Sequence, residues 1–423
     1  MKEIGVQTQS EDSAGPRVLS KIPIPEFEFP QILYSSHTVL WLLAATGILG
    51  YLTFVRDDSD SSLNQRQGLL GLLLVFIFTC GVQLPDSGFL FRPHPAFWRM
   101  LQGLALCYFT ILVYFLFQNL DDSRQILAFL DPKLGKPLPE KNYAADCRIY
   151  TPENPESMFY NIKDCLFDVY IPTHAIGWFF KMIIIRDMKL CWFLSVLFEF
   201  LEITLKFQLP NFAECWWDSL FFDVILCNGG GIYLGYLVCR YFQMKEFYWG
   251  IGEDKRNKTG RFSALSRSAL QLTPHSWLTF NWEMFGSCKN FITTIWYIIF
   301  VNLVDLSNFY LKFILWVPSS HWVLIIRVFF VAFYAIVSTA EYFEYVSSGF
   351  KTRLGANCWL AHMIVFTEWM IILKHSQGMF LDPMPYWLQI VWTGIGCFVV
   401  SSALCLFYSD ISKKNSNKIK SVQ

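Results

Sequence analysis

The sequence predicts an all-α, polytopic membrane protein with about ten transmembrane helices, and three observations carry this prediction. Of the 423 residues, 54% are hydrophobic and 18% are aromatic. Only 16% are charged, whereas a soluble domain usually contains about 25% charged residues. The apolar residues also gather into runs of about 20, the length that an α-helix needs to cross the hydrocarbon core of a bilayer.

Roughly ten apolar runs meet this length criterion. In chain order they lie near residues 39–55, 68–84, 100–117, 169–185, 190–207, 219–242, 291–311, 322–341, 356–373 and 386–408. The fifth and sixth runs are the least typical of lipid-facing helices, because both contain carboxylates. Two of the connections are long: 118–168 is rich in Pro, Asp and Glu, and 245–289 is basic.

The distribution of Lys and Arg predicts that both termini are cytosolic. In this orientation the cytosolic segments contain 20 Lys and Arg residues and the opposite segments contain 11, of which 6 lie in the loop 118–168. Positive residues favour the cytosolic side of a membrane. We therefore expect a cytosolic N-terminal segment, 1–38, a transmembrane catalytic domain, 39–408, and a cytosolic tail, 409–423. The end of the fifth run then faces the lumen.

A set of polar residues interrupts the fifth and sixth runs. Its members are Glu199, Glu202, Asn211, Glu214, Asp218, Asp223 and Asn228. The first two are three residues apart, which places both carboxylates on one face of a helix. Positions 211, 214 and 218 would share another helical face. A capping box that begins at Asn211 is an alternative for the start of that segment, but it does not account for the carboxylates further along.

Each charge near the middle of a membrane costs about 2.5–3.5 kcal/mol. Several carboxylates persist there only if they line a wet cavity, share a proton, pair with cations or bind a metal. The cations nearest in sequence are Lys181 and Lys206. A ligand set of Glu, Asp and Asn oxygens suits a hard divalent cation rather than zinc, and we expect Ca²⁺ in preference to Mg²⁺ or Mn²⁺.

His174 lies in DVYIPTHAIGWFFK, at the predicted lumenal mouth of the fourth run. A lone His at a helix end is commonly a structural hydrogen-bond partner. Beside a carboxylate cluster it is also a candidate general base, because a neutral imidazole can take a proton from a hydroxyl while a carboxylate orients the ring. Arg327, His362 and Glu368 also lie within apolar runs, each isolated in sequence, and no role is assigned to them.

Other features predict contacts rather than chemistry. Gly229–Gly231 and Gly235 give the sixth run a small-residue face that favours close helix packing. Cys147 and Cys165 both fall in the predicted lumenal loop, so a disulfide between them is one alternative. No G-x-x-x-x-G-K-[ST] loop occurs, so we expect no nucleotide cofactor. The D-G-x-x-A-R signature of CDP-alcohol phosphotransferases is also missing.

Four segments together resemble one family. RPHPAFWR, FEFLE, LPNFAECWWD and DVILCNGGGIYLG are similar to segments of the metazoan phosphatidylserine synthases of the base-exchange type. The resemblance covers roughly residues 80 to 408. The loop KLGKPLPEKNYAADCRIYTPEN resembles the second vertebrate isoform, which uses phosphatidylethanolamine as the donor, and phosphatidylcholine stays open as the other donor.

The resemblance implies an enzyme of the endoplasmic reticulum membrane that has ten spans and forms a homodimer. It implies exchange of a phospholipid headgroup for L-serine with a requirement for Ca²⁺. The family's essential polar positions match His174 and all seven polar residues above. Positions with regulatory roles match Arg92, Arg267 and Gln271. Glu341 departs from the family pattern, since related chains carry Arg there, and this leaves product inhibition open.

These observations lead to a hypothesis with named roles. His174 takes the proton of the serine hydroxyl and Glu199 orients the imidazole. The predicted metal ligands are Glu202, Glu214, Asp218 and Asp223, and the predicted substrate-binding residues are Asn211 and Asn228. The alternatives are a transporter or ion channel, because intramembrane carboxylates also mark ion paths, and a scramblase or lipid-binding scaffold without catalytic activity.

Overall fold

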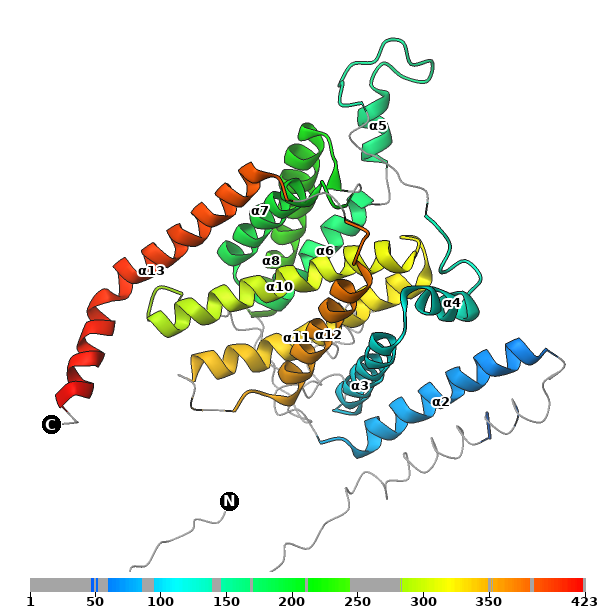
Figure 1. The fold of residues 1–423 in the computed structure, drawn as a ribbon, viewed down its shortest axis with the longest axis horizontal. Coiled ribbons are helices and arrows are strands. Elements are labelled where there is room, and N and C mark those ends of the chain that lie inside the picture. Colours follow the sequence, from blue (N-terminus) through cyan, green and yellow to red (C-terminus); the bar gives the residue numbers. More distant parts are fainter. Residues whose placement is uncertain are drawn as a thin grey trace, which may run out of the picture. The chain divides into compact units, whose positions relative to one another are not determined.

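The structure, a computed structural model, describes residues 47–48, 51, 60–85, 95–138, 146–167, 170–209, 212–243, 282, 284–348, 351, 353–380 and 384–420. The chain divides into two compact units, residues 1–57 and 58–423, and the features below all belong to the second unit (Figure 1). The predicted run 39–55 lies outside the described residues except for positions 47, 48 and 51.

Helices make up the regular structure of the described residues, which contain no strand (Figure 1). The elements are α2 (Ser61–Gln83), α3 (Pro95–Phe117), α4 (Leu120–Leu130), α5 (Tyr160–Leu166), α6 (Tyr170–Ile185), α7 (Met188–Leu205), η3 (Asp218–Gly229), α8 (Gly230–Gln243), α10 (Cys288–Leu315), α11 (Trp322–Ser347), α12 (Ala356–His375) and α13 (Tyr386–Lys420). Each predicted run from 68–84 onward coincides with a helix, and η3 and α8 together form the sixth run. The all-α fold class is confirmed.

Within the part of the chain that the structure describes, seven helical segments are long and apolar enough to cross a membrane. They correspond to α2, α3, η3 with α8, α10, α11, α12 and α13. The apolar part of α6, Ile171–Ile185, is shorter, and the 18 residues of α7 include two Glu. The prediction of a multi-pass membrane protein is therefore confirmed, and the total of ten spans stays a prediction.

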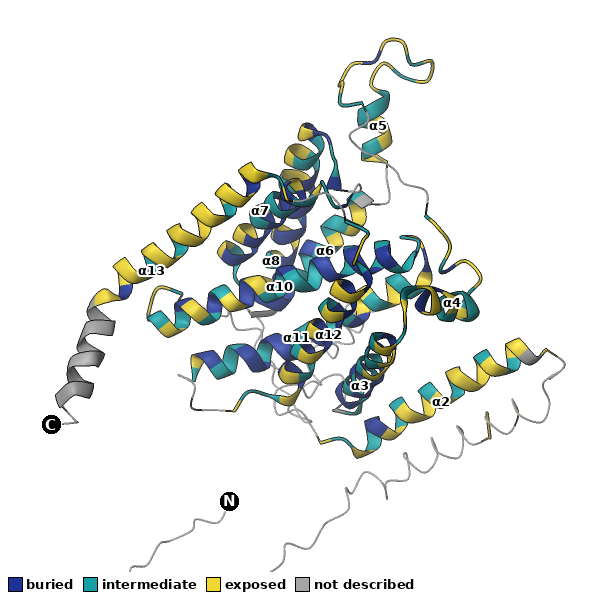
Figure 2. Cartoon of the chain, in the orientation of Figure 1, coloured by how far each residue is buried: buried dark blue, intermediate teal, exposed yellow. Residues whose placement is uncertain are grey.

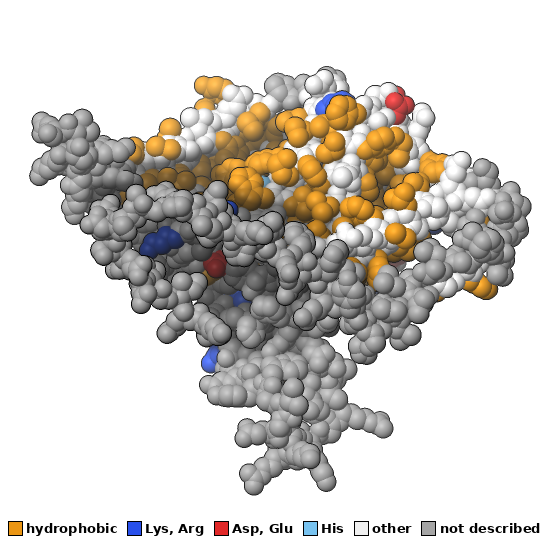
Figure 3. All heavy atoms as spheres, turned by 90° about the horizontal axis from the view of Figure 1, so that it is seen from below, with side chains coloured by type: hydrophobic (Ala, Val, Ile, Leu, Met, Phe, Trp, Pro, Cys, Tyr) orange, Lys and Arg blue, Asp and Glu red, His pale blue; other side chains and the backbone are white. Residues whose placement is uncertain are grey.

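The outer surfaces of these helices are apolar, as contact with lipid requires. Side chains of α2, and of α13 as far as residue 408, are largely exposed (Figure 2), and Leu72 and Phe398 are 70% and 73% exposed. In Figure 3, hydrophobic side chains cover much of the part of this face that is not grey, with few charged groups among them. A face of this kind is stable beside acyl chains rather than in water.

The segment η3 is a π-helix of 12 residues, which is unusual because π-helices mostly occur as single turns at functional sites. Hydrogen bonds in a π-helix join residues five apart. Asp218, Asp223 and Asn228 have this spacing, so the winding brings them toward one side. In an α-helix of 3.6 residues per turn, residues five apart would be rotated by about 140°. The π-helix therefore gathers polar groups that an α-helix would separate.

Helix α6 carries His174 and packs against α8, η3, α7 and α11. The approach of α8 to α6 is close because two glycines face α6. A Cβ atom on Gly231 would lie 2.3 Å from the carbonyl oxygen of Ala175, and one on Gly235 would lie 2.7 Å from the Cβ of Met182. The predicted small-residue face is thus confirmed at these two positions, while Gly230 faces open space.

We expect Gly231→Ala to destabilise the bundle by about 1–3 kcal/mol, the usual effect of overpacking. The added methyl group collides with backbone atoms of α6, which can move only by shifting the helix. The free energy of unfolding in detergent measures the effect. Gly230→Ala is the matched control, because its Cβ meets nothing within 4 Å. Equal stability of the two variants would contradict this account of the contact.

Arg327 and Glu368 are not isolated, contrary to the sequence-based reading. The guanidinium Nη2 of Arg327 in α11 lies 2.6 Å from Oε1 of Glu368 in α12. Tyr108 of α3 donates to the same carboxylate oxygen over 2.5 Å, and Ser307 of α10 donates to Oε2 over 2.7 Å. Four helices therefore meet at one buried carboxylate, which is 2% exposed.

Candidate active site

A cavity of about 930 Å³ opens among α6, α7, η3, α10 and α11. Its walls are mainly aromatic and aliphatic, and they include Phe180, Phe198 and Phe309. The structure brings five of the predicted site residues to this cavity: His174, Glu202, Glu214, Asp218 and Asp223. An apolar chamber with a few converging polar groups is the usual form of a small-molecule site, and here the polar groups are acidic.

His174 and Asp223 form the central contact of the site. The ring Nδ1 of His174, on α6, lies 2.9 Å from Oδ1 of Asp223, on η3. The His174 side chain is 29% exposed and that of Asp223 is 7% exposed. A buried carboxylate on Nδ1 favours the tautomer with a proton on that nitrogen, which leaves Nε2 as the acceptor. Nε2 is then the ring nitrogen available for proton transfer.

Glu199 does not make the contact that the sequence-based hypothesis gave it. Its Oε1 accepts a hydrogen bond of 3.0 Å from Nδ2 of Asn228, and the same amide donates to Oγ of Ser195 over 3.0 Å. The carboxylate in contact with His174 is Asp223. The reason is the winding of η3, which places Asp223 against α6 and Asn228 against α7.

Among the described site residues that the sequence predicts, three buried oxygen atoms have no hydrogen-bond partner. They are Oε2 of Glu199, Oε2 of Glu202 and Oδ1 of Asn228. Such atoms are costly to leave unpaired in a protein interior. Glu202 also experiences repulsion from Glu199 and Asp223. These atoms are the natural ligands for an additional proton, water or cation in this part of the site.

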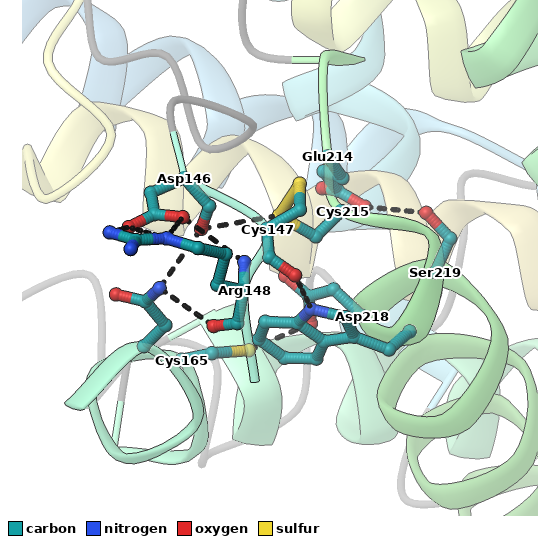
Figure 4. The surroundings of a disulfide bond; sticks show 10 residues. Asp146, Cys147, Arg148, Cys165, Glu214, Cys215, Asp218 and Ser219 are labelled. Atoms are coloured by element: carbon teal, nitrogen blue, oxygen red, sulfur yellow. Dashed lines mark hydrogen bonds and ion pairs between the residues drawn. A yellow bond between two sulfur atoms is a disulfide. The ribbon is translucent and has the colours of Figure 1, made fainter. Parts of the chain in front are cut away.

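A disulfide shapes the segment that carries Glu214. Cys147 pairs with Cys215 (Figure 4), and the indole Nε1 of Trp217 donates to the Cys147 carbonyl over 3.1 Å. The alternative pairing of Cys147 with Cys165 is therefore wrong. Cys165 is a free thiol that donates to Oδ1 of Asp218 over 2.7 Å. The bridge fixes the loop before α5 against the acidic segment.

Two further contacts place the acidic groups near this bridge. Ser219 donates to Oε2 of Glu214 over 3.4 Å (Figure 4). Asp146, which also lines the cavity, accepts from Nε of Arg148 over 3.0 Å. Hydrogen bonds from Arg148 hold the pKa of Asp146 well below its usual range. The Asp146 carboxyl is therefore charged at every physiological pH.

The donor atoms suit a hard cation by their chemistry. Glu, Asp and Asn oxygens are the ligands that Ca²⁺ prefers, and the unpartnered oxygens of Glu199 and Glu202 are donors of this type. Within the described part of the chain, no three His, Cys, Asp or Glu side chains already converge as a metal site. Asp223 and Asp218 are instead engaged by His174 and Cys165.

The comparison with known families decides the class of this site. Residues 93–376 match the family model described as phosphatidyl serine synthase. The chain belongs to this family. The match includes η3 and the helices that line the cavity, so the family's shared sequence covers the site. Membership in a family of phosphatidylserine-synthesising transferases favours an enzyme over the transporter and scaffold alternatives.

Curated relatives of this family resemble the chain over most of its length. A CDP-diacylglycerol–serine O-phosphatidyltransferase 2 of Oryza sativa is 38% identical over 87% of this chain and 88% of the relative. The phosphatidylserine synthase 2 of Danio rerio is 35% identical over 90% of this chain and 83% of the relative. The phosphatidylserine synthase 2 of Homo sapiens is 36% identical over 85% of this chain and 73% of the relative.

Some of the predicted site residues fall outside the described residues. They are Arg92, Asn211, Arg267 and Gln271. Glu341, the predicted departure from the family pattern, is described and has a structural role. Its carboxylate accepts from Nδ2 of Asn357 over 2.6 Å and from the backbone N–H of Cys358 over 2.8 Å. It therefore satisfies donors at the start of α12, where a negative charge is favourable.

Sequence reasoning missed several charged groups of the cavity, of which Asp305 is the one in an ion pair with Lys181. Asp305 of α10 lines the cavity. Its Oδ2 lies 2.8 Å from Nζ of Lys181, on α6. The available signal was a single Asp in the seventh apolar run, where an ionisable residue marks a functional position by default. Lys181 was noted only as a cation near the cluster in sequence.

Proposed function

We propose that this enzyme exchanges phospholipid headgroups, with L-serine replacing ethanolamine or choline to give phosphatidylserine. We further propose that it works as a homodimer in the endoplasmic reticulum membrane, with the site open to the lumen. The observation that carries the reaction is the His174–Asp223 contact beside a carboxylate-lined, otherwise apolar cavity. Such a cavity suits a substrate with acyl chains and a polar headgroup.

His174 is the proposed catalytic base, and Asp223 is its positioning residue. Asp223 holds the proton on Nδ1, so Nε2 accepts the proton of the serine hydroxyl. The serine oxygen forms a new bond to phosphorus while the bond from phosphorus to the old headgroup oxygen breaks. The departing alcohol takes the proton from Nε2, which returns His174 to its starting state. One phosphodiester replaces another, so no nucleotide is consumed.

The acidic residues support a proposal of Ca²⁺ as cofactor. Bound Ca²⁺ would supply Lewis-acid stabilisation of the phosphodiester oxygens. Glu202, Glu214 and Asp218 stay in the proposed ligand set, and the unpartnered oxygen of Glu199 adds a fourth donor. Asp223 contributes to the electrostatics of the set through its contact with His174. Asn228 orients Glu199, and Asn211 stays a predicted substrate contact.

The donor lipid is the point on which the relatives' names differ. The name of the plant relative specifies CDP-diacylglycerol, whereas the synthase 2 names specify no donor. The absent D-G-x-x-A-R signature and the loop that resembles the second vertebrate isoform both favour phosphatidylethanolamine. We therefore place phosphatidylethanolamine first, phosphatidylcholine second and CDP-diacylglycerol third.

The test uses the purified protein in liposomes with radiolabelled L-serine. We expect label in phosphatidylserine with phosphatidylethanolamine as the donor and without nucleotide. Removal of Ca²⁺ with a chelator should lower incorporation to background, since the carboxylates then lack their counter-ion. Added Ca²⁺ should restore incorporation. Incorporation that needs CDP-diacylglycerol would contradict the proposed headgroup exchange. Incorporation that survives chelation would contradict the Ca²⁺ proposal.

A further inference from the structure

An ion pair on the cavity wall stands apart from the proposed catalytic residues. Nζ of Lys181 lies 2.8 Å from Oδ2 of Asp305, and their side chains are 20% and 21% exposed. The ammonium also lies 3.9 Å from the ring centre of Trp178 and 5.3 Å from that of Phe198. Both distances are within the range of cation–π attraction. Lys181 is thus held at one place on the wall.

Lys181 is positioned toward His174. The two residues are seven apart on α6, which leaves them within about 20° of the same helix face and separated by a rise of about 10.5 Å. Long helical side chains lean toward the helix N-terminus. Lys181 follows this rule, because its ammonium lies over Trp178, three residues earlier. The charge is therefore displaced from its own Cα toward the base.

The electrostatics of the cavity favour a fixed cation, besides the proposed Ca²⁺, for the choice of serine. L-Serine differs from ethanolamine by one carboxylate. The acidic residues of the cavity repel that group and attract the amine that both molecules share. Among the described residues, Lys181 and Lys312 are the Lys and Arg that line the cavity. The Lys181 charge acts on His174, Glu199 and Glu202.

We propose that Lys181 and Asp305 form the subsite that selects L-serine as the acceptor. Lys181 binds the serine carboxylate and Asp305 binds its ammonium, so the zwitterion takes the place of the direct ion pair. The hydroxyl then points along α6 toward Nε2 of His174. Ethanolamine satisfies Asp305 alone. This inference rests on the proposed exchange reaction and deepens it, because it names the residues that decide which alcohol attacks.

The test compares two acceptors in the same liposomes. Lys181→Met keeps the length of the side chain and removes its charge. We expect the KM for labelled serine to rise about 10- to 100-fold, as for loss of a charge-assisted hydrogen bond. Incorporation of labelled ethanolamine into the same phosphatidylethanolamine liposomes, where it replaces the unlabelled headgroup, should change less than about threefold on the same reasoning. Lys181→Arg should restore much of the serine preference.

Two controls separate binding from folding. Lys312→Met removes the other described cavity cation and should keep the wild-type ratio of serine to ethanolamine use. The double variant Lys181→Met/Asp305→Asn leaves no unpaired charge and should also lose serine preference. In the single variant Lys181→Met, equal losses for both acceptors, or an unchanged serine KM, would overturn the inference while leaving the exchange reaction standing. A wild-type protein that incorporates neither acceptor would overturn the proposed function itself.

Discussion

We expect His174→Ala to lower serine incorporation by about 10²- to 10⁴-fold, the usual contribution of a positioned acid–base group. His174 supplies Nε2 to the cavity while Asp223 holds Nδ1 at 2.9 Å. Without the imidazole, the serine hydroxyl must lose its proton to water. Ca²⁺ binding should persist, because the proposed carboxylate ligands are intact. Incorporation of labelled serine and isothermal titration with Ca²⁺ measure the two properties separately.

A matched variant sharpens this prediction. His174→Gln keeps a side-chain amide that can donate to Asp223 but has no group that accepts and returns a proton. It should be as inactive as His174→Ala while unfolding at the same temperature as the wild type. Asp223→Asn should also reduce turnover, since the amide no longer favours the reactive tautomer. Normal exchange in His174→Gln would remove the imidazole from the mechanism.

We expect Glu368→Leu to destabilise the protein by about 3–5 kcal/mol, the usual effect of removing one partner from a buried ion pair. The substitution leaves the Arg327 guanidinium in the bundle without its counter-ion and removes the acceptor for Tyr108 and Ser307. Denaturant titration in detergent, or the midpoint of thermal unfolding, measures the loss.

The double variant Arg327→Met/Glu368→Leu is the control for this effect. It removes both charges together, so no uncompensated charge stays buried, and much of the lost stability should return. A double variant as unstable as the sum of the two single variants would show that the helices do not depend on the pairing. Wild-type stability of Glu368→Leu would contradict the contact itself.

Much of the fold follows from local pattern in the sequence. The apolar runs from 68–84 onward coincide with helices because a span needs a continuous apolar stretch, which is visible residue by residue. Carboxylates placed inside such runs are costly, so they identify the acidic cavity before any coordinates exist. Gly231 and Gly235 likewise predict a close helix contact from their lack of side chains.

The contacts between side chains inside the site could not be predicted from local sequence pattern. Sequence periodicity assumes an α-helix, yet η3 is a π-helix, whose hydrogen bonds join residues five apart. In this helix Asp223 contacts His174 and Asn228 contacts Glu199. The disulfide joins Cys147 to Cys215 across 68 positions, although Cys165 was nearer in sequence. The residues next to each cysteine in the sequence do not indicate such a distant partner.

The sequence by itself determined that this chain is a helical membrane protein of the phosphatidyl serine synthase family with an acidic, His-containing region. The tertiary structure alone decided which groups meet: Asp223 on His174, Asp305 on Lys181, and Glu368 on Arg327. The physical reason is that burial and helix formation depend on neighbours a few residues away, whereas ion pairs depend on how whole helices pack. Burial makes the Glu368–Arg327 pair matter most, because water is not there to replace a missing partner.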